Sequence, residues 1–134
     1  MTDSCDMTLH AVGVIRSALV DRRAAPKQGS EGAPDAWIEI EPWAADALHR
    51  IAAGDEIIVL TWLHQARRDV LQVHPRGSVR TPLHGVFATR SPDRPNPIGL
   101  HPVTVRAVEG PRLRVGPIEA IDGTPVVDIK IALS

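Results

Sequence analysis

Short apolar runs of β type, separated by glycine and proline turns, constrain the fold of this chain more than any other feature. They cover residues 11–20, 37–41, 56–64, 69–74, 84–89, 100–108, 112–118 and 126–132. A single helical pattern interrupts them, opening at Pro42 and ending at Gly54. Because strands and helices do not alternate, a doubly wound, Rossmann-type sheet is disfavoured. We expect a mainly β fold, a small closed or nearly closed antiparallel β-barrel with one short helix.

The tryptophans are expected to fill the core or an interface, since each lies in an apolar pattern. Trp37 and Trp62 belong to β-type runs, and Trp43 follows the proline that opens the helical pattern. In that pattern the apolar side chains at positions 43, 44, 47, 48 and 51 fall on one face. These positions define the predicted apolar face of the helix.

Length and composition predict one cytoplasmic domain. The chain has 134 residues, of which 43% are hydrophobic, with 15 basic and 16 acidic side chains. This balance provides no global basic field for nonspecific nucleic-acid binding. Cys5 is the only cysteine, which excludes an internal disulfide and a multi-cysteine zinc site. No apolar run reaches the roughly 18 residues of a membrane helix, so we expect no membrane anchor. From the length we expect a single domain over residues 1–134, with 1–8 as a flexible leader.

Four prolines stiffen residues 85–103, which have the sequence GVFATRSPDRPNPIGLHPV. Each proline fixes its own φ at about −65° and biases the preceding residue toward extended geometry. Arg90 and Arg94 stand four positions apart, with Ser91, Asp93 and Asn96 beside them. Donors and acceptors are thus concentrated on a backbone that has little freedom to relax. This pattern predicts a binding edge.

Several common catalytic motifs are absent from the sequence. There is no GxGxxG or GxxxxGK[ST] motif, so neither a dinucleotide-binding fold nor a P-loop is supported. The six histidines show none of the HxH, HxxxH or HExxH spacings that place two metal ligands on one face, so we expect no metal. No serine lies in a GxSxG motif, which leaves serine hydrolysis without support.

Two long motifs carry a family resemblance: GVFATRSPDRPNPIG at 85–99 and IDGTPVVDIK at 121–130. Together they resemble the TsaA-like (TrmO) family of S-adenosylmethionine-dependent tRNA adenine N6-methyltransferases. The resemblance extends to GVIRS at 13–17, PKQG at 26–29 and WLHQ at 62–65. It implies a small β-barrel that binds S-adenosylmethionine without a Rossmann fold, as a homodimer with the cofactor near the subunit interface. It also implies a tRNA substrate, methylated at N6 of threonylcarbamoyl-adenosine at position 37.

The resemblance and the chemistry of the cofactor together predict a site spread over several segments. Its residues are Pro26, Lys27, Gln28, His64, Gln65, Phe87, Arg90, Leu100, Glu119, Ile121, Asp122, Gly123 and Thr124. Within this set, Phe87, Leu100 and Ile121 would contact the apolar face of the adenine. Asp122 would bind the ribose hydroxyls, Arg90 would bind the carboxylate, and loop carbonyls would face the sulfonium.

The implied reaction is a direct displacement, in which the exocyclic amine of an adenosine attacks the methyl carbon in line with the departing sulfur. Catalysis then depends on placing amine and methyl within about 3–3.5 Å and on excluding water. A carboxylate that accepts an amine hydrogen would help as the nitrogen becomes positive. Asp128 and Asp93 are the candidates for this catalytic role.

Each site residue also has an ordinary structural explanation. Arg90 and Arg94 could be solvated cations, paired with a nearby carboxylate such as that of Asp93. His64, at the end of an apolar strand, could be a structural residue rather than a ligand contact. The DGTP segment is what a tight turn requires even without a ligand.

Three functions stay open from the sequence. The first is a methyltransferase that acts on tRNA, the second a methyltransferase for a different acceptor, and the third a non-catalytic barrel that binds the cofactor as a sensor. For the first, a dimer could join ten basic residues into a shared groove for RNA. They are Arg16, Arg22, Arg23, Lys27, Arg67, Arg68, Arg76, Arg80, Arg90 and Arg94.

Overall fold

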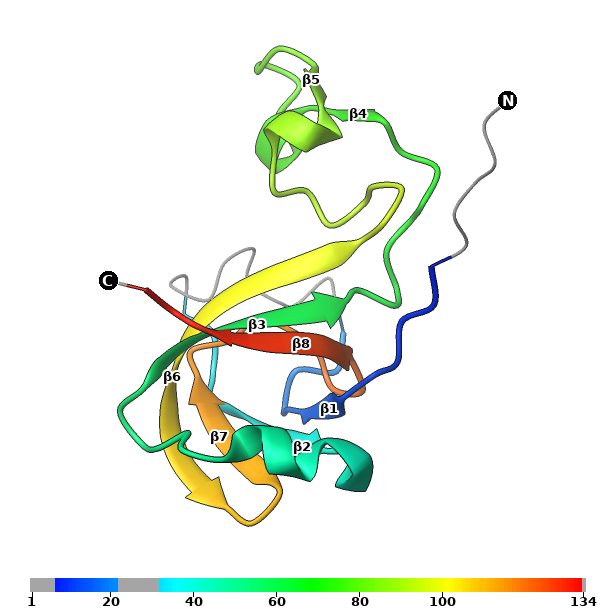
Figure 1. Ribbon diagram of the computed structural model, residues 1–134. Helices are drawn as coiled ribbons and strands as arrows, with labels where there is room; N and C mark the ends of the chain where they lie inside the picture. The colour runs from blue at the N-terminus through cyan, green and yellow to red at the C-terminus, as the bar shows by residue number, and fades with distance from the viewer. Residues whose placement is uncertain (1–6, 22–31, 134) are drawn as a thin grey trace.

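The computed structural model describes residues 7–21 and 32–133, with the exception of the Arg76 side chain. Its main body is a closed six-stranded barrel with the order β1-β2-β7-β6-β3-β8 (Figure 1). The strands are β1 (Gly13–Arg16), β2 (Ala36–Ile40), β3 (Glu56–Trp62), β6 (Ile98–Glu109), β7 (Arg112–Gly116) and β8 (Pro125–Ile131). Every neighbouring pair is antiparallel, including the β1–β8 pair that closes the ring. The predicted closed antiparallel barrel is confirmed.

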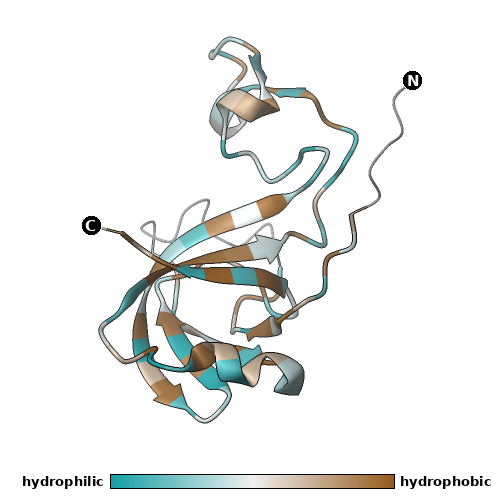
Figure 2. Cartoon of the chain, viewed as in Figure 1, coloured by the Kyte–Doolittle hydropathy of each residue, from teal (hydrophilic) through white to brown (hydrophobic). Residues whose placement is uncertain are grey.

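Inward and outward positions alternate along the barrel strands, which gives the bands of high and low hydropathy in Figure 2. The inward positions form one apolar core. Its fully buried members include Ile15, Ile38, Ile57, Val59, Leu113, Val115 and Val126. Burying one such side chain stabilises the fold by about 1.5–3 kcal/mol. The apolar side chains buried inside the barrel are therefore the main source of its stability.

The helical segment predicted after Pro42 is present as the 3-10 helix η2 (Pro42–Leu48), at the lower end of the barrel in Figure 1. Ala44 is buried in the core, and Leu48 packs against it. Trp43, predicted for the apolar face, is instead 65% exposed. A 3-10 helix has three residues per turn, so Trp43 lies about 120° around the axis from Ala44 and faces solvent.

Residues 63–97 form an arm that projects from the barrel between β3 and β6 (Figure 1). Its elements are β4 (Gln72–Val73), η3 (Pro75–Gly77), β5 (His84–Gly85) and η4 (Val86–Ala88). The strands predicted over 69–74 and 84–89 are therefore wrong except for two residues each. These segments pair only with each other in a two-stranded sheet and lie outside the barrel core, and of their apolar side chains only Val86 is buried. Leu71 and Phe87 are accordingly 66% and 89% exposed.

Arginine side chains hold the proline segment of the arm in place. Arg94 donates through its two Nη atoms to the backbone carbonyls of residues 86 and 89. Arg68 lies over the Trp62 ring, 5.0 Å from its centroid, and donates from Nε to the Pro95 carbonyl at 2.8 Å. The guanidinium groups thus add to the stiffness that the prolines supply.

Among the described residues, none of the helical segments is long and apolar enough to span a bilayer.

Candidate functional site

Several predicted cofactor residues lie around the end of the barrel from which the arm projects. His64 and Gln65 leave this end directly after β3, and both are exposed. Val126 of β8 pairs with Thr61 near the end of β3. Residues 119–124, which lead into β8, therefore reach the same end of the barrel.

Residues 121–124 form a tight turn that is tied to the chain after β1. Gly123 has a φ of 84°, in the left-handed region that glycine favours. Thr124 Oγ1 donates to the carbonyl of Ile121 at 2.7 Å, and these two side chains are only 1% and 7% exposed. Asp122 Oδ1 accepts the backbone N–H of Ser17 at 3.0 Å. The turn has a complete structural role without any ligand.

Beside this turn, three side chains form a hydrogen-bonded chain that was not predicted from the sequence. His101 Nδ1 lies 2.5 Å from Glu119 Oε1, and His101 Nε2 lies 2.7 Å from Thr61 Oγ1. Thr61 and His101 are buried, whereas the Glu119 side chain keeps 18% of its surface exposed. A signal was present in the sequence: His101 alternates with Val103 and Val105, so it faces inward on β6. A buried imidazole needs hydrogen-bond partners.

The outer face of the barrel brings together one predicted cofactor residue and one predicted catalytic residue. Leu100 of β6 pairs with Leu60 of β3, and Leu60 pairs on its other side with Asp128 of β8. Leu100 is 40% exposed, and the Asp128 side chain is 50% exposed. Asp128 Oδ2 lies 3.6 Å from Lys130 Nζ. The sheet therefore presents an apolar strip with a carboxylate at its edge.

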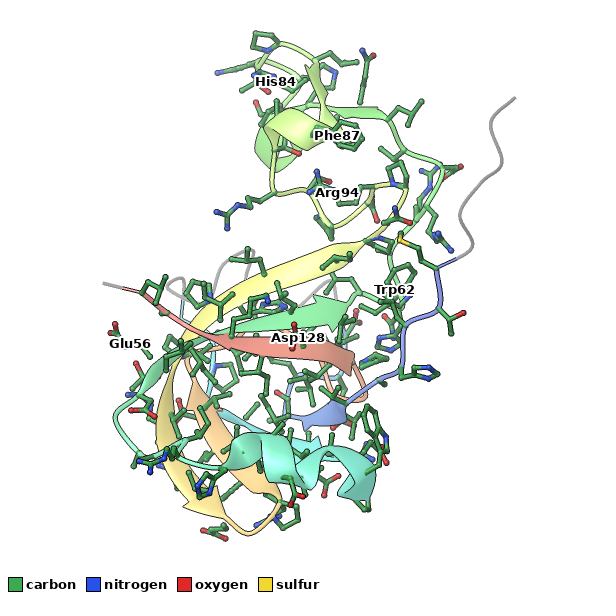
Figure 3. All side chains as sticks on the ribbon, viewed as in Figure 1. Glu56, Trp62, His84, Phe87, Arg94 and Asp128 are labelled. Carbon is green, nitrogen blue, oxygen red and sulfur yellow. The ribbon has the colours of Figure 1, made fainter. Side chains whose placement is uncertain are left out.

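The other predicted residues lie on the arm. Figure 3 shows Phe87 far from Asp128 of the barrel, and Phe87 is 89% exposed. Arg90 is exposed, and it has no hydrogen-bond or ion-pair partner in the part of the chain that the structure describes. Asp93 Oδ1 accepts the backbone N–H of Arg67 at 2.8 Å. A single chain does not bring the three predicted adenine contacts together, because Phe87 is on the arm whereas Leu100 and Ile121 belong to the barrel.

Some expectations fall outside the described residues. Pro26, Lys27 and Gln28 of the predicted cofactor site lie there, as do Arg22 and Arg23 of the predicted basic groove. The predicted leader over residues 1–8 lies there as well, except for its last two residues.

An exposed ion pair in the arm changes the titration of its two members. Arg67 donates to both carboxylate oxygens of Asp69, at 3.1 and 2.9 Å. This contact, with help from the backbone N–H of Asp69, holds the pKa of Asp69 below its ordinary value of 3.8 and raises the pKa of Arg67. On the barrel, the hydrogen bond from Arg16 to Glu39 raises the pKa of Arg16 in the same way. Arg16 and Arg67 are therefore already engaged by carboxylates.

A shallow hollow of about 680 Å³ lies near η2 and the β6–β7 turn, away from the base of the arm. It is lined by Ala45, Asp46, Leu48, His49, Val108 and Gly110. None of the predicted cofactor or catalytic residues lines it. The candidate site is thus the surface around the base of the arm.

Comparison with known proteins supports the resemblance seen in the motifs. Residues 14–133 match the family described as tRNA-methyltransferase O N-terminal domain. An S-adenosyl-L-methionine-binding protein of Archaeoglobus fulgidus is 46% identical over 124 residues, which are 92% of this chain and 88% of that protein. A probable S-adenosyl-L-methionine-binding protein of Methanothermobacter thermautotrophicus is 44% identical over 126 residues, 93% of this chain and 89% of that protein.

A solved structure leads to the same family. The crystal structure of TrmO from P. aeruginosa superposes with a TM-score of 0.78 at 30% identity. The match covers 99% of this chain and 57% of that one, so the chain spans little more than half the length of that protein. Both long motifs and nearly every described barrel strand lie within the family match. The chain therefore belongs to the tRNA-methyltransferase O N-terminal domain family.

Proposed function

We propose that this chain binds S-adenosylmethionine and transfers its methyl group to N6 of threonylcarbamoyl-adenosine at position 37 of a tRNA. Membership of the family and the names of the archaeal relatives support the cofactor. The observation that carries the proposal is a set of groups with complementary chemistry, divided between the arm and the end of the barrel from which the arm projects. On the arm, Arg90 offers an exposed cation without a described partner. On the barrel, Leu100 offers an exposed apolar surface, and residues 119–122 offer two partly buried carboxylates.

These groups fit the parts of the cofactor. The guanidinium of Arg90 suits the carboxylate of the methionine moiety, because such pairs form charge-assisted hydrogen bonds. The exposed strip that contains Leu100 suits the flat face of the adenine. A carboxylate of residues 119–122 suits the ribose hydroxyls. S-adenosylmethionine supplies the electrophilic methyl group, so the protein needs no covalent nucleophile.

A second copy of the chain would complete the site. Arg90 and Phe87 belong to the arm, whereas Leu100 and the 119–122 carboxylates belong to the barrel. The arm contains six arginines and two aspartates, for a net charge of +4, whereas the rest of the chain contains nine basic and fourteen acidic side chains, for −5. An arm docked on the barrel of a second copy therefore satisfies charge complementarity and covers the exposed Phe87. We accordingly include a homodimer in the proposal.

The charge of the arm also supports an RNA acceptor. Arginines of the barrel are paired with carboxylates: Arg16 with Glu39 at 2.8 Å, and Arg112 with Glu109 at 3.3 Å. Arg80 of the arm, which lies outside the predicted cofactor site, is exposed and has no side-chain partner among the described residues. Cations that are free of carboxylates are available to phosphates, and binding then weakens with salt. The arm is thus the proposed contact for the tRNA backbone.

The chemistry demands positioning more than proton transfer. The protein must hold the amine in line with the methyl group and exclude water around them. Asp128 is the better placed of the two candidate acceptors for an amine hydrogen, because it borders the strip that contains Leu100. Asp93 already accepts the Arg67 N–H within the arm. Acceptance of a hydrogen bond by Asp128 would stabilise the positive charge that develops on the attacking nitrogen.

Calorimetric titration with S-adenosylmethionine tests the cofactor site. We expect Arg90→Ala to weaken binding by about tenfold or more, the size of one lost hydrogen bond between charged groups. Arg80→Ala is the matched control, since Arg80 is an exposed arginine of the same arm outside the predicted site, and it should bind as the wild type does. Equal affinity in all three proteins would remove Arg90 from the site.

Incubation with tRNA tests the acceptor. The substrate is tRNA from a strain that lacks this modification, and the product is sought by mass spectrometry of the digested nucleosides. Methylated threonylcarbamoyl-adenosine is the expected result. Binding of S-adenosylmethionine with methylation of another acceptor would move the proposal to that acceptor. Binding without turnover on any RNA would favour a sensor barrel.

A further inference from the structure

The buried chain of Thr61, His101 and Glu119 runs from the inside of the barrel to a partly exposed carboxylate. The exposed fraction of the side chain rises from 3% at His101 to 18% at Glu119, and Thr61 is fully buried. Glu119 Oε1 is occupied by His101, and Glu119 Oε2 has no partner in the described part of the chain. The carboxylate is therefore held by one oxygen and open at the other.

The hydrogen bonds of His101 indicate which of its two ring nitrogens carries the proton that faces Glu119. An ionised carboxylate only accepts hydrogen bonds, so the proton between Glu119 and His101 belongs to Nδ1. The Thr61 hydroxyl can donate to Nε2 of a neutral imidazole or accept from Nε2–H of a charged one. In both cases Nδ1 remains the donor toward Glu119. Thr61 thus fixes the ring without competing for that contact.

Gly99, two residues before His101 on β6, leaves room for the hydrogen-bonded pair of Thr61 and His101. A methyl group at Gly99 would lie 2.6 Å from His101 Nε2 and even closer to Thr61 Oγ1. Such contacts are far below ordinary van der Waals distances, so a side chain at Gly99 would displace the imidazole or the hydroxyl. The glycine of the NPIG sequence therefore provides the space that the pair requires.

We propose that His101 is a positioning residue for the cofactor site, and that it acts through Glu119 on the ribose hydroxyls of S-adenosylmethionine. This inference rests on the proposed function. It assigns the ribose contact to Glu119 rather than to Asp122. Each carboxylate has one oxygen engaged, but Asp122 ties the 121–124 turn to the backbone of Ser17, whereas Glu119 is held by a buried side chain, His101, that Thr61 fixes in turn. Fixing one oxygen of a carboxylate leaves the other in a single orientation, which lowers the entropy lost on binding.

A double-mutant cycle tests whether His101 acts through Glu119. We expect His101→Leu and Glu119→Gln each to weaken binding of S-adenosylmethionine by about tenfold. The double variant should bind no more weakly than Glu119→Gln alone. His101→Asn, which retains a side-chain N–H near the position of Nδ1, should recover part of the affinity, and His49→Leu, at an exposed histidine near η2, should have no effect. Additive losses in the double variant would overturn the proposal.

A change of ligand separates this role from a general loss of structure. An S-adenosylmethionine analogue without ribose hydroxyls should bind to the wild type and to His101→Leu with the same affinity. A tenfold loss for that analogue as well would show that His101 only supports the fold. Thermal melting of each variant identifies any that fail to fold. If His101→Leu fails to fold, His101→Gln replaces it in the cycle, because its amide lies near the position of Nε2, which faces Thr61, and leaves no donor near Nδ1.

A measurement without ligand separates this inference from the proposed function. In long-range ¹H–¹⁵N spectra of the free protein, we expect His101 to carry a proton on Nδ1, and the Nδ1 signal to shift in Glu119→Gln. A neutral His101 protonated at Nε2 alone would overturn the His101–Glu119 contact, whether or not the cofactor binds. If the tautomer is as expected but wild-type protein does not bind S-adenosylmethionine, the proposed function fails and the ribose role fails with it, while the contact itself stands.

Discussion

Leu100 and Asp128 flank the same residue, Leu60, from opposite sides on the outer face of the barrel. Neighbouring strands lie about 4.8 Å apart, so the backbones of Leu100 and Asp128 are roughly 10 Å from each other. Their separation in the sequence gives no hint of this relationship. It places an apolar surface and a carboxylate within the dimensions of one nucleoside.

Substitutions at these two positions should affect different steps. We expect Leu100→Ala to weaken binding of S-adenosylmethionine by about tenfold, since a leucine that becomes buried contributes about 1.5–3 kcal/mol. Asp128→Asn should leave that affinity unchanged and lower kcat by about tenfold or more, because it would remove the charge that we propose stabilises the transition state. Glu56→Gln, at the other end of β3 (Figure 3), is the control and should change neither value. A loss of cofactor affinity in Asp128→Asn would contradict the assignment.

Phe87 should control the oligomeric state. Its side chain is 89% exposed on the arm, so association through the arm would bury it. We expect the wild type to elute at the mass of a dimer in size-exclusion chromatography with light scattering, and Phe87→Asp to elute as a monomer. Trp43→Asp, at a 65% exposed tryptophan of η2, should remain dimeric. A wild-type monomer at micromolar concentration would contradict the dimer.

Gly13 should be essential to the pairing of β1 with β2. A methyl group at this position would lie 2.6 Å from the backbone oxygen of Glu39 and 3.3 Å from Ile40 Cδ1. The backbone of β2 cannot move without disturbing the barrel, so Gly13→Ala should lower the free energy of unfolding by about 1–3 kcal/mol. Gly85→Ala is the matched control, because nothing lies within 4 Å of its added methyl group. Urea denaturation of both variants checks this difference.

The Arg67–Asp69 pair predicts how the arm responds to acid. The pKa of Asp69 is lowered in the folded protein from its ordinary value of 3.8, so its contribution to stability is present above that value. The contribution is lost as the pH falls through the lowered pKa and Asp69 becomes protonated. Arg67→Gln should return the pKa of Asp69 toward 3.8, as measured by NMR titration of the carboxyl carbon. An unchanged pKa would show that the backbone N–H, rather than Arg67, is the main cause.

Periodicity predicted the barrel strands better than the arm, for a physical reason. β3 and β6 bury alternate residues against a common core, and a period of two in the sequence reports that environment directly. Residues 69–74 and 84–89 show a similar pattern without entering the core, because they extend beyond the barrel. The start of the helical pattern at Pro42 was predicted correctly, but the helix is of the 3-10 type and ends at Leu48 rather than at Gly54, and Trp43 faces outward.

The candidate site was predictable only in part. Leu100 and Arg90 were reached through the family resemblance, and both are exposed. Ile121, reached in the same way, is buried. His101 was not selected, because it belongs to no metal-binding spacing and its partners lie 40 and 18 positions away in the chain.

The sequence by itself determined the family, the antiparallel barrel and the stiffness of the proline segment, since motifs, periodicity and proline geometry are local properties of the chain. Only the tertiary structure decided which residues meet. Closure of the barrel places Leu100 opposite Leu60 and Asp128, and it brings His101 between Thr61 and Glu119. It also sets the arm, with Arg90 and its positive charge, apart from the more acidic barrel. Contacts of this kind depend on strand register and burial, which no single stretch of sequence encodes.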